Sequence, residues 1–159
     1  MQRRHLVQHF ARGTLFLGSL ALLAGCAAPP PAPATLSLTI VGGANQNPDT
    51  SGHPASVAVR IIQLASAGSF MQADVFALMN REQATLGAAD LGSEQVLVSP
   101  GQTVTVSHPL KPGTNALGIA VLFRDINHAT WRVSAPVPAT GEVKLRLTTN
   151  GLVAALTKG

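Results

Sequence analysis

The chain has 159 residues, of which 46% are hydrophobic, 11% are charged and 4% are aromatic. This length predicts a single domain with a buried core, and the composition excludes a disordered polyelectrolyte. Because Cys26 is the only cysteine, intramolecular disulfides and Cys-rich metal sites are excluded as well. The formal net charge of +4 and the pI near 10.2 raise the question of nucleic-acid binding, which the positions of the basic residues answer.

Residues 1–25 are typical of a secretory signal peptide. Arg3, Arg4 and Arg12 precede an apolar run at residues 14–23, and small residues follow that run. The run is shorter than the roughly 20 residues that a membrane-spanning helix needs. Paired arginines also occur in twin-arginine signals, so both the Sec and the twin-arginine export routes stay open.

The sequence Leu23-Ala24-Gly25-Cys26 resembles a bacterial lipobox, in which the cysteine is lipidated and becomes the first residue of the mature chain. Cys26 is therefore the predicted lipidation site, and several acyl chains would hold the protein durably at a membrane. The alternative is an unmodified cysteine beside an ordinary cleavage site. Ala27 stands where an Asp would retain a lipoprotein at the inner membrane, so we expect the outer membrane, with the domain facing the periplasm.

Cleavage removes most of the basic excess. Three of the eleven basic residues lie within 1–25, so eight remain against seven acidic residues, a net side-chain charge of +1. We therefore expect no nucleic acid among the partners. Residues 26–34 contain four prolines among alanines, which favours an extended, semi-rigid tether in front of a folded domain over residues 35–159.

Alternating apolar and polar residues predict short strands along most of residues 35–159, and turn residues separate them. A hairpin is expected at Asn150-Gly151, the preferred pair of a type I′ turn. The run 115–123 is apolar on both faces, as in a central strand. The pattern predicts an all-β sandwich. The other alternating segments begin at Leu36, Val57, Val104, Trp131 and Leu145.

One short helix is expected over residues 69–80, where apolar residues recur with helical spacing. Ser69 is a candidate N-cap, and Phe70 is a candidate hydrophobic staple. The helical spacing involves Met71, Val75, Leu78 and Met79. We interpret these side chains as core packing rather than as part of a cofactor site.

The mature chain shows no catalytic motif. Its histidines, His53, His108 and His128, lack the spacing of metal ligands, and no nucleophile-elbow, zinc-protease, dinucleotide or phosphate-loop motif occurs. The seven carboxylates form no pair along the sequence, although carboxylates can converge in space. We expect no enzymatic activity, no metal and no cofactor. A small envelope hydrolase would require a cleft in which carboxylates meet.

The connection over residues 42–54 is long for a sandwich, in which short loops dominate. Rigid scaffolds often display functional residues on such loops. A surface loop without a partner is the alternative, because Asn45, Asn47 and Asp49 are also ordinary turn formers.

Taken in order, these features resemble the outer-membrane lipoprotein family of type VI secretion systems, known as TssJ, SciN or VasD. The family pattern has a tyrosine where this chain has Ile62. The matching segments are the lipobox at Cys26, Asn45–Asp49, Pro54–Leu64, Phe70–Asp74, Leu117–Arg124 and Trp131-Arg132.

The resemblance implies a two-sheet, transthyretin-like sandwich with one short added helix. It implies an outer-membrane lipoprotein that anchors the trans-envelope complex of the secretion system by binding the periplasmic C-terminal region of TssM. The loop between the first two strands is implicated in this contact, so that deletion of residues 44–52 is expected to preserve the fold and abolish binding. The loop residues so assigned are Gly43, Ala44, Asn45, Gln46, Asn47, Pro48 and Asp49, in a segment that extends to His53.

An alternative hypothesis is a solitary periplasmic lipoprotein module that binds a glycan or another small ligand on the same sandwich. A row of exposed aromatic side chains would favour it. The mature chain offers four aromatic residues, which we expect in the core: Phe70, Phe76, Phe123 and Trp131. Together with Phe123 and Trp131, Arg60 is expected to support the sheet rather than to contact a partner.

Overall fold

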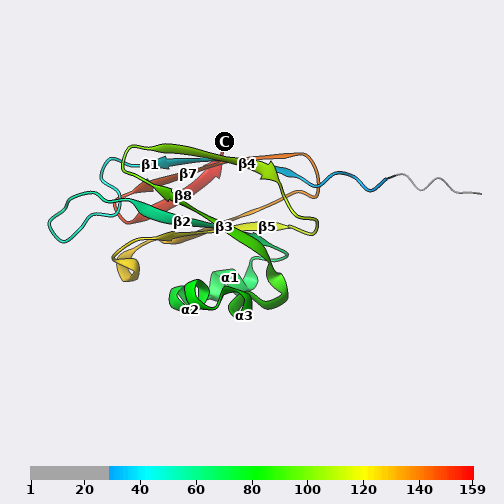
Figure 1. Ribbon diagram of the computed structural model, residues 1–159, viewed down its shortest axis with the longest axis horizontal. Coiled ribbons are helices and arrows are strands. Elements are labelled where there is room, and N and C mark those ends of the chain that lie inside the picture. Colours follow the sequence, from blue (N-terminus) through cyan, green and yellow to red (C-terminus); the bar gives the residue numbers. More distant parts are fainter. Residues whose placement is uncertain (1–28) are drawn as a thin grey trace, which may run out of the picture. The chain divides into compact units, whose positions relative to one another are not determined.

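The computed structural model of the chain describes residues 29–159, so the predicted signal peptide and Cys26 lie outside the described residues. Residues 31–159 contain two four-stranded sheets that lie face to face (Figure 1). None of the described helices has the length and hydropathy that a membrane-crossing segment requires.

One sheet has the strand order β4-β1-β7-β8 and the other has the order β3-β2-β5-β6. Neighbouring strands run antiparallel except β1 and β7, which are parallel. The strands are β1 (Thr35–Gly42), β2 (Val57–Leu64), β3 (Asp90–Val98), β4 (Thr103–Pro109), β5 (Ala116–Leu122), β6 (Arg132–Pro136), β7 (Glu142–Asn150) and β8 (Val153–Lys158). The fold is the predicted all-β, two-sheet sandwich.

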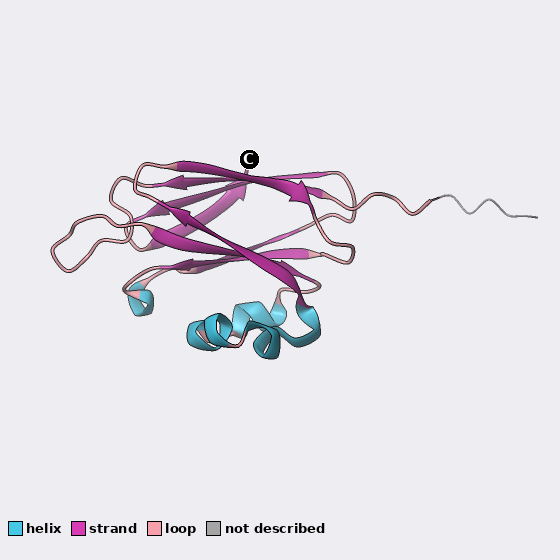
Figure 2. Ribbon diagram, in the orientation of Figure 1, coloured by secondary structure: helices cyan, strands magenta, loops and turns pink. Residues whose placement is uncertain are grey.

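The alternation in the sequence determines which side chains enter the core. In β1, every second residue from Leu36 to Gly42 is buried, and β7 alternates in the same way. β5 is buried on both faces, as predicted, because its inner face meets the other sheet and its outer face meets the helical layer. Figure 2 shows that layer against the outside of one sheet.

Two short helices replace the single helix predicted over residues 69–80, and a third follows them directly. The chain is extended at Ala73 and Asp74, and the Asp74 carboxylate accepts hydrogen bonds from the N–H groups of Phe76 and Ala77 at 2.9 and 3.0 Å. An Asp that caps a second helix ends the first one, which the apolar spacing could not reveal. The helices are α1 (Gly68–Gln72), α2 (Val75–Asn80) and α3 (Glu82–Leu86), and the 3₁₀ turns are η1 (Gly87–Ala89) and η2 (Ile126–His128).

The predicted cap and staple of the first helix are also wrong. Ala67 occupies the N-cap position of α1 without a side-chain hydrogen bond, so Ser69 lies inside the helix. Phe70 is fully buried in the cluster between the helices and the sheet. A Cβ on Gly118 of β5 would lie only 3.0 Å from the Phe70 ring, so this glycine provides the space in which the ring packs.

Two strand features differ from the sequence analysis. β3 was not predicted, because its apolar and polar residues do not alternate: Glu94 lies on the partly buried face, whereas Leu97 on the other face is 65% exposed. The β7–β8 turn consists of Gly151 and Leu152, since Asn150 already pairs with Val153. Only Gly151 has a positive φ, of 56°, whereas a type I′ turn needs two such residues.

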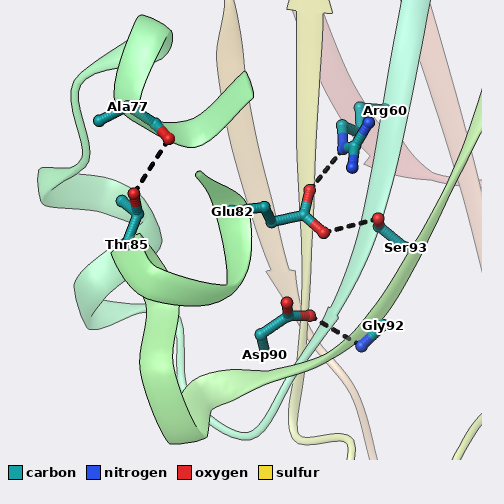
Figure 3. Close-up of polar contacts among 7 residues, drawn as sticks. All are labelled: Arg60, Ala77, Glu82, Thr85, Asp90, Gly92 and Ser93. Atoms are coloured by element: carbon teal, nitrogen blue, oxygen red, sulfur yellow. Dashed lines mark hydrogen bonds and ion pairs between the residues drawn. The ribbon is translucent and has the colours of Figure 1, made fainter. Parts of the chain in front are cut away.

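Polar contacts hold the helical layer on its sheet. The Glu82 carboxylate accepts hydrogen bonds from Arg60 Nε of β2 and, at 2.7 Å, from Ser93 Oγ of β3 (Figure 3). From β6, the Arg132 guanidinium donates to the carbonyls of Phe70 and Ala73 at 3.2 and 2.7 Å. Arg60 therefore has the structural role expected for it.

Candidate partner-binding loop

The loop predicted to bind a partner connects β1 to β2 and protrudes from one end of the sandwich (Figure 1). β1 begins where the tether joins the domain, at Thr35, and ends where the loop begins. The tether and the loop therefore lie at opposite ends of β1.

Two glycines allow the chain to leave β1 between the two sheets. A Cβ on Gly42 would lie 2.5 Å from the Ser99 carbonyl oxygen, and one on Gly43 would lie 2.2 Å from the Thr149 carbonyl oxygen. Both distances are shorter than any side chain tolerates, so the backbone requires glycine at both positions. The start of the loop is therefore fixed in place.

Gln46 links the two sheets from inside the loop. Its side chain is 0% exposed, and its Nε2 donates a 2.8 Å hydrogen bond to the carbonyl of Val98 at the end of β3. Its Oε1 accepts a hydrogen bond from the hydroxyl of Thr149 in β7. β3 and β7 belong to different sheets, so the Gln46 side chain forms a hydrogen bond with one buried polar group from each sheet.

Asn47 is the second buried polar residue of the loop, at 3% exposure. Its φ of 47° lies in the left-handed region, which Asn tolerates better than most residues. Its Nδ2 donates to the Ser56 carbonyl and its Oδ1 accepts from the Arg124 backbone N–H, both at 2.8 Å. Its own N–H donates to the Gly151 carbonyl at 2.8 Å. Asn47 thus connects three loops at this end of the sandwich.

Asp49 shapes the tip of the loop. Its carboxylate accepts hydrogen bonds from the N–H groups of Ser51 and His53, at 2.8 and 2.9 Å, and from the His53 ring at 3.3 Å. The backbone N–H of His53 is the largest cause that lowers the pKa of Asp49 below its ordinary value. Residues 50–54 are all exposed around this carboxylate. The tip therefore has a defined shape and is accessible to a partner.

The predicted loop residues thus divide into two groups. The side chains of Gln46 and Asn47 are buried inside the protein, whereas Ala44 and Asn45 are exposed. Gly43, Pro48 and Asp49 are half-buried. Deletion of residues 44–52 would remove both buried amides, so the expectation that this deletion preserves the fold does not agree with their contacts. No pattern in the sequence distinguished the buried amides from the exposed one.

A small apolar pocket lies at the same end of the domain, between α2 and the β5–β6 connection. It has a volume of about 210 Å³. Phe76 is 62% exposed beside it, so the expectation that this ring belongs to the core was wrong. The pocket is lined by Val75, Phe76, Met79, Leu122, Phe123, Arg124 and Ile126.

A larger groove of about 760 Å³ lies between β6 and the ends of β7 and β8, and no aromatic side chain lines it. Among the described aromatic residues, Phe70 and Phe123 are buried, Trp131 is half-buried and Phe76 alone is exposed. The row of exposed aromatics that would favour a glycan-binding module is therefore not found in residues 29–159.

The histidines lie apart from one another in residues 29–159. Each pairs with one carboxylate, and no group of three potential metal ligands occurs within that range. The pairs are His53 with Asp49, His108 with Glu94 and His128 with Asp125. The structure therefore brings together the polar residues of the loop, but not the three histidines of the described segment.

Comparison with known proteins agrees with this architecture. The family model described as type VI secretion lipoprotein (T6SS-SciN; VasD, EvfM, TssJ) matches residues 34–152. No curated protein sequence matches the chain.

Solved structures show the same fold. The chain is similar to the T6SS lipoprotein TssJ1 from Pseudomonas aeruginosa, with a TM-score of 0.77 and 28% identity over 80% of this chain and 97% of that one. It is also similar to Serratia marcescens Lip, a membrane-bound component of the type VI secretion system (TM-score 0.71, 25% identity, 80% and 98% covered). A third match is in a structure described as the T6SS protein TssM C-terminal domain from EAEC (TM-score 0.62, 30% identity, 79% and 98% covered). With its sandwich, its long first loop and the family match over most of its length, the chain belongs to the type VI secretion lipoprotein family.

Proposed function

We propose that this lipoprotein is acylated at Cys26, faces the periplasm from the outer membrane, and anchors the trans-envelope complex of the type VI secretion system by binding the periplasmic C-terminal region of TssM. The observation that carries the proposal is the β1–β2 loop, whose base is held by buried amides and whose tip is exposed. A preorganised loop loses little conformational freedom when it binds, which favours affinity.

The direction of the domain supports this role. The tether joins the domain at Thr35, whereas the loop leaves at the other end of β1. A tether held at a membrane would therefore direct the loop away from that membrane, toward a partner in the periplasm. The similarity to a chain in a structure described as the TssM C-terminal domain from EAEC supports the choice of partner.

Within the loop, we assign direct contacts to the exposed residues Ala44 and Asn45 and to the tip from Asp49 to His53. Gly43 and Pro48 shape the chain between them. Gln46 and Asn47 are positioning residues, because their amides already form hydrogen bonds within the protein.

Calorimetric titration tests the proposed contact. The mature lipoprotein, solubilised in detergent, is titrated with the purified periplasmic C-terminal region of its cognate TssM. We expect Asn45→Ala combined with His53→Ala to weaken binding by about 5- to 30-fold, the range of one or two interface residues that each contribute 1 kcal/mol or more. Thr140→Ala, an exposed change at the tether end, is the matched control and should leave the Kd within twofold. Unchanged affinity in the loop variant would overturn the assignment of the loop.

The anchor is tested separately by Cys26→Ser. Fractionation of cells should move this variant from the outer-membrane fraction to the soluble periplasmic fraction, because the thiol that carries the lipid is lost. Persistence of Cys26→Ser in the membrane fraction would contradict lipid attachment at this residue.

A further inference from the structure

We infer that the apolar pocket between α2 and η2 is a second part of the same binding surface and receives one apolar side chain of TssM. This inference rests on the proposed function. We refer to the pocket below as the Phe76 pocket, lined by Val75, Phe76, Met79, Leu122, Phe123, Arg124 and Ile126.

The fold presents Phe76 to solvent while holding its helix firmly. Val75 and Leu78 of α2 are buried, and the Asp74 carboxylate caps the helix through the Phe76 and Ala77 N–H groups. The Phe76 ring consequently projects from a fixed helix at 62% exposure, beside the half-buried Met79 and Ile126. Exposed apolar side chains around a hollow are typical of interaction sites, whereas one isolated exposed residue needs no explanation.

The Phe76 pocket is continuous with the base of the loop. Arg124 lines the pocket, and its backbone N–H donates the 2.8 Å hydrogen bond to Asn47 Oδ1. The wall of the pocket and the base of the loop are therefore connected directly. A partner that contacts the tip of the loop can extend over the Arg124 segment to Phe76.

The chemistry of the loop explains why such an extension is needed. Its accessible residues are polar or small, and Asn45, Ser51 and His53 are typical of the rim of an interface. Stable interfaces also contain a desolvated core in which aromatic and aliphatic side chains supply most of the binding energy. The Phe76 pocket is an apolar hollow adjoining the loop that can supply this core.

The volume of the pocket limits its occupant. At about 210 Å³ it is smaller than the pockets of about 300–1,000 Å³ that take drug-sized ligands. It suits a single large side chain, such as Leu, Met or Phe, projecting from a folded partner. The aromatic ring of Phe76 and the thioether of Met79 favour contact with such a group.

Calorimetry with the same detergent-solubilised lipoprotein and the same TssM region tests the inference. Phe76→Ala removes the exposed ring, and Ile126→Asp introduces a charge on the opposite wall of the pocket. We expect each to raise the Kd by about 5- to 30-fold, as truncation of an interface anchor does. Met71→Ala is the matched control, because Met71 is a 43% exposed apolar residue on the neighbouring helix α1 and does not line the pocket. The Kd of Met71→Ala should stay within twofold of the wild-type Kd. Thermal unfolding should show that Phe76→Ala remains folded.

The outcomes separate this inference from the proposed function. In one outcome the wild type binds TssM and the loop variant binds more weakly, but the Kd values of Phe76→Ala and Ile126→Asp both stay within twofold of the wild-type Kd. The Phe76 pocket is then not part of the interface, and the loop assignment stands. If the wild-type protein does not bind TssM, both proposals fail. If sedimentation shows that the wild type self-associates and that Phe76→Ala abolishes this, the pocket binds a second copy and the inference is overturned.

Discussion

The side-chain oxygen of Asn47 accepts a 2.8 Å hydrogen bond from the backbone N–H of Arg124, a residue 77 positions further along the chain. This contact joins the β1–β2 loop to the segment that follows β5. Asn47 is buried and has a left-handed backbone conformation, so its side chain and its backbone both determine where the tip of the loop lies. The loop proposed to bind TssM is thus part of the rigid domain at its base.

The buried amide of Gln46 should contribute to stability. Gln46→Ala removes the buried partner of the Val98 carbonyl and leaves the Thr149 hydroxyl with only long contacts, to Gly43 N at 3.4 Å and to the Val41 carbonyl at 3.5 Å, and loss of a buried partner is costly. We expect the free energy of unfolding to fall by about 1–3 kcal/mol in urea denaturation. Asn45 lies next to Gln46 and its amide is exposed, so Asn45→Ala should change the free energy of unfolding by less than about 0.5 kcal/mol. Equal effects of the two variants would contradict a structural role for Gln46.

Gly118 should not tolerate a side chain. A Cβ at this position would lie 2.9 Å from Leu64 Cδ1 and 3.0 Å from the Phe70 ring, both of which are fully buried. Gly118→Ala should therefore destabilise the protein by about 1–3 kcal/mol through overpacking. Gly68→Ala is the control, because no atom lies within 4 Å of the added Cβ and alanine favours the helix. Thermal unfolding of both variants checks this, and an unchanged Tm for Gly118→Ala would show that the helical layer moves to accommodate the methyl group.

The ion pair between Arg60 and Glu82 should matter more than the one between Lys144 and Glu142. Glu82 is mostly buried and accepts from both Arg60 and Ser93, so Glu82→Ala removes two hydrogen bonds to a charged group, one of them from a guanidinium. We expect Glu82→Ala to lower the free energy of unfolding, measured by urea denaturation, by about 1–3 kcal/mol. Lys144 and Glu142 are more than half exposed, and Glu142→Ala should cost less than about 1 kcal/mol. A loss as small for Glu82→Ala as for Glu142→Ala would show that this contact does not hold α3 on its sheet.

His108 and Glu94 should make stability depend weakly on pH. The His108 ring contacts the Pro109 carbonyl through Nδ1 at 3.0 Å and the Glu94 carboxylate through Nε2 at 2.5 Å. The Pro109 carbonyl first, and then Glu94, raise the pKa of His108 above its ordinary value of 6.5, because both acceptors favour the doubly protonated ring.

A raised pKa in the folded state means that the folded protein holds this proton more tightly than the unfolded chain does. The stabilisation is complete below pH 6.5 and is lost as the pH rises through the folded-state pKa. The effect should stay below about 1 kcal/mol, because the pair is partly exposed. Urea denaturation between pH 5 and pH 9 checks this against His108→Gln, and an identical pH dependence in the two proteins would rule out a contribution from His108.

The sequence determined the features that depend on local pattern. Alternation with a period of two placed Leu36, Leu38 and Ile40 on the inner face of β1, and the apolar run at residues 115–123 predicted the central strand β5. These predictions succeeded because burying an amphipathic strand requires only that its apolar face meet any other apolar face. The order of the motifs along the chain likewise indicates the family without reference to the fold.

Contacts between distant parts of the chain determine which polar and aromatic residues face inward. Gln46 and Asn47 are buried because groups on β3, β7 and the segment after β5 lie within hydrogen-bonding distance, and those groups are distant in the sequence. Phe76 is exposed because Asp74 begins a new helix and turns the ring away from the core. Burial of an amide depends on its partners and exposure of a ring depends on the orientation of its helix. The partners of the amides are distant in the sequence and the orientation of α2 depends on the sheet it packs against, so the composition of the proposed binding surface is visible only in the folded domain.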